Sequence, residues 1–158
     1  MTIAALATAG AVLAGCGTID KSGGVGDTLG ARGVDVTVLK VDESVPRPER
    51  DITGLGTPRP GTRFTGVKVK ACTGDDQAVK AYDFQLEPAE GESVRPRTPV
   101  TVYSDSFDVL RSGCETGWLV FPLPSGARAE AVKFSYDDTG TPGQGGRNGK
   151  RLRFTWKL

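Results

Sequence analysis

The chain of 158 residues has three cysteines, whose surroundings indicate two different kinds of chemistry. Cys16 follows an uncharged, apolar stretch over residues 1–15. This stretch is too short to span a bilayer and has the size of the hydrophobic region of a signal peptide. Leu13, Ala14, Gly15 and Cys16 match the bacterial lipobox, in which small residues admit a signal peptidase and the cysteine thiol carries a diacylglycerol. We therefore expect Cys16 to be a lipid attachment point.

This motif predicts the organisation of the N-terminal part. Residues 1–15 are expected to be a lipoprotein signal peptide, and residues 16–26 the lipidated cysteine and a flexible, Gly-rich tether with a reach of roughly 17 Å. Several acyl chains anchor a protein stably where one does not, so we expect attachment to the outer face of the cell membrane. The alternative is a buried apolar helix with an incidental cysteine, but the stretch has no amphipathic stripe.

Cys72 and Cys114 remain as a pair. In an exported domain a disulfide is the expected state of such a pair. Two buried free thiols are the alternative, and a metal site is weaker because no further soft ligands lie nearby. No tryptophan lies between the two cysteines, unlike in antibody domains, and Cys72 is in phase with Lys68 and Lys70 on the solvent side. We expect a peripheral disulfide that joins strand ends.

Other catalytic and binding chemistry finds little support in the composition. The chain has no histidine, which excludes Ser-His-Asp and Cys-His catalysis and imidazole zinc sites. Its net charge of +1 does not fit a nucleic-acid binder. The carboxylate pairs at 75–76 and 137–138 lack the spacing of a calcium loop and are interpreted as solvated turn residues. No metal and no cofactor is expected.

From Gly33 onward, apolar residues recur with period two, which predicts strands rather than helices. A parity change between Phe64 and Val67 suggests a bulge near Gly66. The Pro-rich stretch over 42–61 is expected to be a surface loop. Seven or eight short strands over residues 27–158 indicate a single all-β domain, an antiparallel β-sandwich. The expected strands cover residues 34–38, 63–72, 82–86, 100–103, 107–110, 118–123, 132–136 and 152–158.

Six basic side chains occupy outward positions of these strands. If the strands are neighbours, the six form one basic face that could contact anionic polymers or lipid headgroups. Ordinary edge protection and solubility is the alternative explanation. The six are Lys68, Lys70, Lys133, Arg151, Arg153 and Lys157.

The combined pattern resembles a family of small exported bacterial lipoproteins with one immunoglobulin-like domain, related in fold to secreted immunoprotective antigens. The resemblance covers residues 25–158. It implies an immunoglobulin-like antiparallel β-sandwich, export and a Cys72–Cys114 disulfide, and it implies no catalytic residue. The Gly-rich insert over 137–150 departs from the family. The matching segments are Val25–Thr28, Val34–Val38, Gly61–Lys70 with Cys72, Tyr82–Phe84, Gly113–Pro124, Val132–Tyr136 and Trp156.

We therefore expect a non-enzymatic protein of the cell envelope, anchored to the membrane through Cys16, with an immunoglobulin-like domain that binds a protein or an anionic polysaccharide. Two alternatives remain open. One is a structural or accessory subunit of an envelope complex, whose sheet edge pairs with another chain. The other is a hydrolase that uses carboxylates alone, which needs two acids about 5–9.5 Å apart in a cleft.

Overall fold

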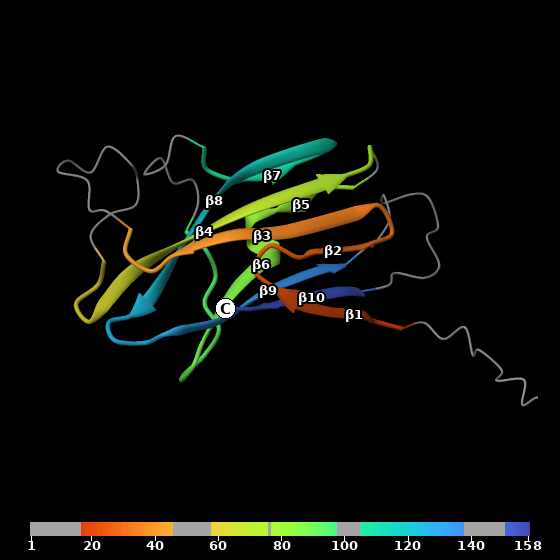
Figure 1. Ribbon diagram of the computed structural model, residues 1–158. Coiled ribbons are helices and arrows are strands. Elements are labelled where there is room, and N and C mark those ends of the chain that lie inside the picture. The colour runs from red at the N-terminus through yellow and green to blue at the C-terminus, as the bar shows by residue number, and fades with distance from the viewer. Residues whose placement is uncertain (1–16, 46–57, 76, 98–104, 138–150) are drawn as a thin grey trace, which may run out of the picture.

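The computed structural model describes residues 17–45, 58–75, 77–97, 105–137 and 151–158, and these residues form β-strands almost throughout (Figure 1). None of the helices in these ranges is long and apolar enough to cross a membrane. The expected signal peptide, Cys16, the strand at 100–103 and most of the loop at 42–61 and of the Gly-rich insert lie outside the described residues.

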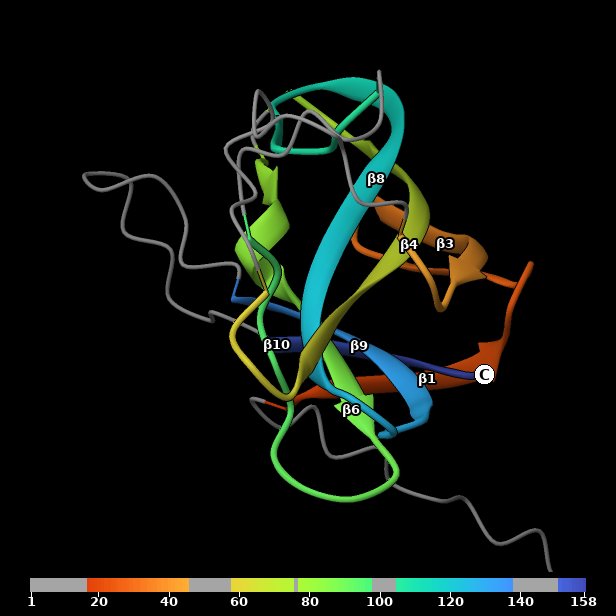
Figure 2. The ribbon, with the colours of Figure 1, turned by 90° about the vertical axis from the view of Figure 1, so that its left-hand side faces the viewer.

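The strands form two four-stranded sheets that pack face to face (Figures 1 and 2). Sheet A has the order β1 (Ile19–Gly24), β10 (Arg151–Lys157), β9 (Ala129–Asp137), β6 (Phe84–Pro88). Sheet B has the order β2 (Thr28–Ala31), β3 (Val34–Asp42), β4 (Thr62–Thr73), β8 (Gly113–Pro124). The short strands β5 (Val79–Lys80) and β7 (Val109–Leu110) form a third pair, and the 3₁₀ turn η1 (Ala81–Asp83) leads into β6. The predicted all-β β-sandwich is confirmed, and its strand pairs in the described residues are antiparallel except the parallel pair of β1 and β10.

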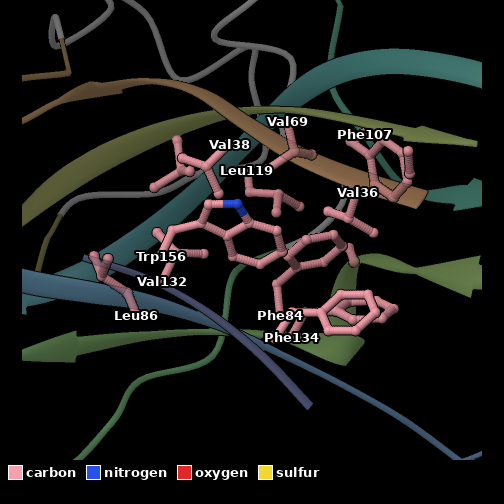
Figure 3. Close-up of a cluster of buried hydrophobic side chains, with 14 of the residues drawn as sticks. Val36, Val38, Val69, Phe84, Leu86, Phe107, Leu119, Val132, Phe134 and Trp156 are labelled. Atoms are coloured by element: carbon pink, nitrogen blue, oxygen red, sulfur yellow. The ribbon is translucent and has the colours of Figure 1, made fainter. Parts of the chain in front are cut away.

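The core lies between the two sheets because the apolar residues of each strand alternate with polar ones. Trp156 of β10 is completely buried in the middle of this core. Figure 3 shows its ring between Val38 and Leu119 of sheet B and the side chains of sheet A. Aromatic rings continue the core along sheet A, with ring centroids 6.1 Å apart for Phe154–Trp156 and 5.6 Å apart for Phe134–Phe154. The period-two pattern thus predicted the inward positions of β3, β9 and β10 correctly.

The tether expected over residues 16–26 is wrong for Ile19–Gly24, which form the edge strand β1 and pair in parallel with β10. The glycines and serine of β1 carry no alternation that would reveal a strand. Its pairing instead depends on backbone hydrogen bonding to β10, on Ile19 against the core, and on Lys21, whose Nζ donates to the Gly30 carbonyl of β2. The sandwich therefore begins eight residues before the expected domain start at 27.

Two local expectations are also wrong. Tyr82 does not belong to a strand: Asp83 Oδ2 accepts a hydrogen bond from the Lys80 N–H at 2.7 Å, which starts η1, and Tyr82 is 54% exposed. The register of β4 with β8 is continuous past Gly66, and the irregularity lies instead in β3, between Val38 and Lys40. Phe64 breaks the parity because it is buried outside the main core cluster.

The outer edge of β8 is covered by the segment around Phe107. The Phe107 N–H donates to the Trp118 carbonyl at 2.9 Å, and the Trp118 N–H donates to the Asp105 carbonyl at 2.7 Å. Gly117 lies directly beneath this segment. A Cβ atom at Gly117 would lie 2.7 Å from the Phe107 nitrogen and 2.9 Å from its Cα, closer than real contacts allow. Glycine is therefore required at this position for the two backbones to approach.

Replacing Gly117 by alanine is expected to lower the free energy of unfolding by about 1–3 kcal/mol, because the added methyl group meets backbone atoms that cannot move alone. The measurement is urea-induced unfolding followed by fluorescence. Gly74→Ala is the matched control, since nothing lies within 4 Å of a Cβ there and its φ is not in the positive range. Equal unfolding midpoints for both variants and the parent chain would contradict the close approach.

Candidate binding site on the outer face of sheet A

A hollow of about 330 Å³ opens on the outer face of sheet A. The strand register places Asp20 of β1, Arg153 of β10 and Ser135 of β9 side by side in one row across the sheet. The next row contains Thr155 of β10 and Lys133 of β9. On β6, Gln85 pairs with Lys133 and continues this second row, and Asp83, just before β6, completes the lining.

The hollow offers both signs of charge together with neutral donors and acceptors. Lys133 Nζ lies 2.8 Å from Glu87 Oε2, so this ammonium group is already held in place by a neighbouring strand. Arg153 and Asp20 are both exposed. With the hydroxyl and amide groups beside them, these side chains suit a polar ligand with hydroxyl groups and a charged group that Arg153 can contact. The rigid sheet beneath them keeps their backbones at fixed spacing.

Asp83 is an acid of the hollow whose pKa is shifted by burial. Burial raises the pKa of its carboxyl group above the ordinary value, and the charge of Asp137 acts in the same direction. The hydrogen bond from the Lys80 N–H and the charge of Lys80 lower this pKa but do not offset the effect of burial. At the rim, the hydrogen bond from Arg151 holds the pKa of Asp137 below its ordinary value. The pKa values of the two acids are therefore shifted in opposite directions from the same ordinary value.

This difference predicts a pH-dependent effect of the Asp83→Asn substitution. Because the folded-state pKa of Asp83 is raised, its protonated form stabilises the fold fully below pH 3.8, the ordinary value, and this stabilisation is lost as pH rises through the folded-state pKa. The free energy of unfolding of the parent chain relative to Asp83→Asn should therefore fall across this window. The measurement is urea unfolding at a series of pH values.

Asp137→Asn is the control for this series. Because the pKa of Asp137 is lowered, the parent chain should lose stability relative to this variant as pH falls towards the folded-state pKa, the opposite trend. A difference between the parent chain and Asp83→Asn that stays constant with pH would show that Asp83 is not perturbed.

The single basic face expected from the sequence does not exist. Lys68 and Lys70 lie on β4 of sheet B, whereas the other four residues lie on sheet A, on the opposite side of the sandwich. Lys68 contacts Asp105 at 3.2 Å and lies 5.6 Å from the centre of the Trp118 ring. Alternation alone shows which residues point outward, but sheet membership decides whether two outward faces coincide.

On sheet A the structure brings two of the expected basic residues together. Lys133 and Arg153 both line the hollow. Arg151 is paired with Asp137, with Nε 2.6 Å from Oδ1, and Lys157 lies towards the other end of β10, opposite Ala131. Lys133 and Arg153 are thus the two residues of the predicted basic face that lie together at the hollow.

Cys72 and Cys114 form the predicted disulfide. They are direct partners in the β4–β8 ladder, with Cα atoms 4.0 Å apart, and each lies next to the end of its strand. Cys72 is half-buried and Cys114 is exposed, so the disulfide is peripheral and lies within one sheet. It does not cross the core, in agreement with the sequence-based expectation.

Sequence reasoning missed Asp20, Asp83 and Gln85 as members of a site. Gln85 could have been placed by its alternation with Phe84 and Leu86, but Asp20 was assigned to a tether and Asp83 precedes the strand. Within the described residues, no group of three or more potential metal ligands is present. Asp75 is exposed, Asp137 is ion-paired, and their neighbours at 76 and 138 lie outside the described residues.

The two packed sheets define a β-sandwich, a fold that is also found in several bacterial proteins. No protein-family model and no curated protein matches the chain. Among solved structures, MPT63, a secreted protein from Mycobacterium tuberculosis, aligns with a TM-score of 0.54 and 14% identity, over 87% of this chain and 96% of that one. A functionally unknown protein from Listeria monocytogenes aligns with a TM-score of 0.55 and 11% identity, over 85% of this chain and 82% of that one.

A third similar structure is ycdA, a candidate lipoprotein of Bacillus subtilis. It aligns with a TM-score of 0.51 and 16% identity, over 82% of this chain and 38% of that one. At such identities these similarities show a shared fold alone.

Proposed function

We propose that the chain is an exported, lipid-anchored protein of the cell envelope that acts by binding and not by catalysis. The lipobox at Cys16 supports the anchor. The Cys72–Cys114 disulfide fits a compartment outside the cytosol, where such bonds persist. The fold it shares with a secreted protein and with a candidate lipoprotein agrees with export.

The hollow on sheet A is the observation that carries the binding role. Arg153 provides positive charge for an anionic group, beside Lys133, which is paired with Glu87. Asp20 can accept hydrogen bonds from hydroxyl groups, and Ser135 and Thr155 can accept or donate them. An anionic polysaccharide or an acidic, polar protein surface has this chemistry. The hollow is partly open to solvent, which suits a segment of a polymer or protein surface.

The two carboxylates of the hollow do not suit hydrolysis. Asp20 comes from β1 and Asp83 from the start of β6, and two strands lie between β1 and β6 in the sheet. Three strand spacings place the two backbones about 14 Å apart, whereas the carboxyl groups of a glycosidase pair lie roughly 5–9.5 Å apart. This separation supports binding over a carboxylate-dependent hydrolase.

The test compares how strongly three versions of the full lipidated chain crosslink to isolated cell envelope. The double variant Lys133→Glu/Arg153→Glu should bind envelope polymer or protein several-fold less in crosslinking experiments, while its lipid anchoring is unchanged. Lys40→Glu/Lys70→Glu, two exposed sheet B residues, is the matched control for charge. Equal crosslinking by the parent chain, the hollow variant and the control variant would contradict binding at the hollow.

A specific observation also favours the second candidate, an accessory subunit of an envelope complex. Val25 and Leu158 follow β1 and β10, which are paired through Gly24 and Lys157. Leu39 lies near them, because the Gly26 N–H donates to the Val38 carbonyl at 2.8 Å. All three apolar side chains are exposed by 38–45%. Loss of a co-purifying subunit from a Leu39→Lys variant, but not from the hollow variant, would favour this candidate.

A further inference from the structure

The start of β1 limits how far the folded domain can lie from an anchor at Cys16. This argument rests on the proposed lipid attachment. Ile19, the first residue of β1, follows Cys16 by three positions, and three residues span at most about 11 Å even when fully extended. The parallel ladder with β10 holds Ile19 opposite Leu152, and Ile19 packs against the core. The acylated residue is therefore tied closely to one end of a rigid body.

That end, called the near end here, is formed by Ile19, the Arg32 turn between β2 and β3, Gly113 at the start of β8, and the Asp137–Arg151 pair. The register brings these segments together: Ile19 is opposite Leu152 next to Arg151, and Thr73 pairs with both Val34 and Gly113. In Figure 1 these segments lie on the right, where β1 begins.

The opposite end of the sandwich, called the far end, contains the turns after β6 and β8, with Glu92 and Ser125. Figure 2 views the molecule from this side. The strands β4 and β8 have twelve residues each and run between the two ends. Twelve residues in a strand extend for roughly 40 Å, so an anchor at one end leaves the other far from the membrane.

The surface chemistry of the near end suits lipid headgroups. Arg32 and Arg111 are exposed there, beside the exposed Asp75, and Arg151 is exposed in its pair with Asp137. The far end exposes Glu90 and Glu92 at one turn and Arg59 and Arg128 at others, so charge alone does not distinguish the two ends. The exposed apolar residues Val25 and Leu158 lie at the other end of β1, away from the near end. The near end therefore exposes charged side chains of both signs and none of these apolar ones, which suits contact with polar headgroups without insertion into the hydrocarbon layer.

We propose that the near end rests on the headgroup layer of the outer leaflet, with the strands directed away from the membrane. In this orientation Asp20 and Arg153 lie one residue further from the membrane, along β1 and β10, than Ile19 and Leu152 at the near end. The hollow on sheet A then opens sideways just above the headgroups. A ligand therefore has to approach the hollow along the membrane surface. The far-end turns face away from the membrane.

The experiment uses the full, lipidated chain in vesicles of phosphatidylethanolamine and phosphatidylglycerol. A photocrosslinking benzoylphenylalanine replaces Arg32 at the near end or Ser125 at the far end, both exposed turn residues. The short link predicts at least about five times more crosslinking to lipid from position 32 than from position 125. Equal crosslinking from the two positions would overturn the orientation.

A spacer provides the internal control. Inserting ten Gly and Ser residues between Thr18 and Ile19 leaves β1 intact and raises the mean reach of the connection to about 20 Å. The near-to-far ratio should then fall towards one, and an unchanged ratio contradicts the role of the short link. The mass of the N-terminal peptide separates the two proposals: absence of a diacylglycerol on Cys16 refutes the anchor, whereas an acylated chain with equal crosslinking refutes only the orientation.

Discussion

Replacing Trp156 by alanine is expected to lower the free energy of unfolding by about 3–5 kcal/mol, the largest single-residue effect in this molecule. Trp156 is the largest completely buried side chain among the described residues and lies where the two sheets meet (Figure 3). Its removal leaves a cavity that the β-sheets cannot collapse to fill, since their backbones are held by ladders on both sides. It also removes the edge-on contact with Phe154.

Trp156→Phe is the companion variant, which is expected to fold. It keeps an aromatic ring but loses the indole Nε1 donor to the Asp27 carbonyl, which is 2.9 Å away in the turn between β1 and β2. We expect a smaller loss of about 1–3 kcal/mol, from the lost hydrogen bond and the smaller ring. Urea unfolding with the disulfide intact measures both variants. A loss below about 1 kcal/mol for Trp156→Ala would contradict its central position.

Removing the disulfide with the double substitution Cys72→Ala/Cys114→Ala is expected to lower the free energy of unfolding by about 2–4 kcal/mol. The two cysteines are 42 positions apart in the chain, so the crosslink constrains a long loop of the unfolded state. The native ladder between β4 and β8 does not depend on the bond, because the backbones of Cys72 and Cys114 are partners within continuous pairing. The variant should therefore keep its fold and lose stability.

The same experiment gives two further readouts. The unfolded chain without the crosslink exposes more surface, so the dependence of the free energy on urea concentration should become steeper. The parent chain treated with a dithiol should reach the same midpoint as the double variant, because Cys114 is exposed to the reductant. Equal midpoints with and without the disulfide would show that the loop is already constrained in the unfolded state.

Local alternation was sufficient to predict the strands that have one buried face. Leu152, Phe154 and Trp156 alternate with polar residues, and all three lie in the core. The same holds for Val34, Val36 and Val38. Side chains of a strand point alternately to the two faces, so a strand with one buried face has alternating apolar and polar residues in its sequence.

Strand β1 could not be predicted this way, because its residues form an edge where backbone pairing and not side-chain burial decides the conformation. The bulge was misplaced for a related reason. Phe64 was assigned to the same face as Val67, whereas it is buried outside the main core cluster. A single sequence shows that a residue is apolar and does not show which surface covers it.

The sequence by itself determined the elements whose chemistry is local: the pairing of Cys72 with Cys114 and the alternating strands of a β-sandwich. The tertiary structure alone decided which outward residues share a face. It separated Lys68 and Lys70 from Lys133 and Arg153, and it brought Asp20 and Asp83 to one hollow. Neighbours across a sheet are set by strand order and register, which depend on contacts between residues far apart in the chain.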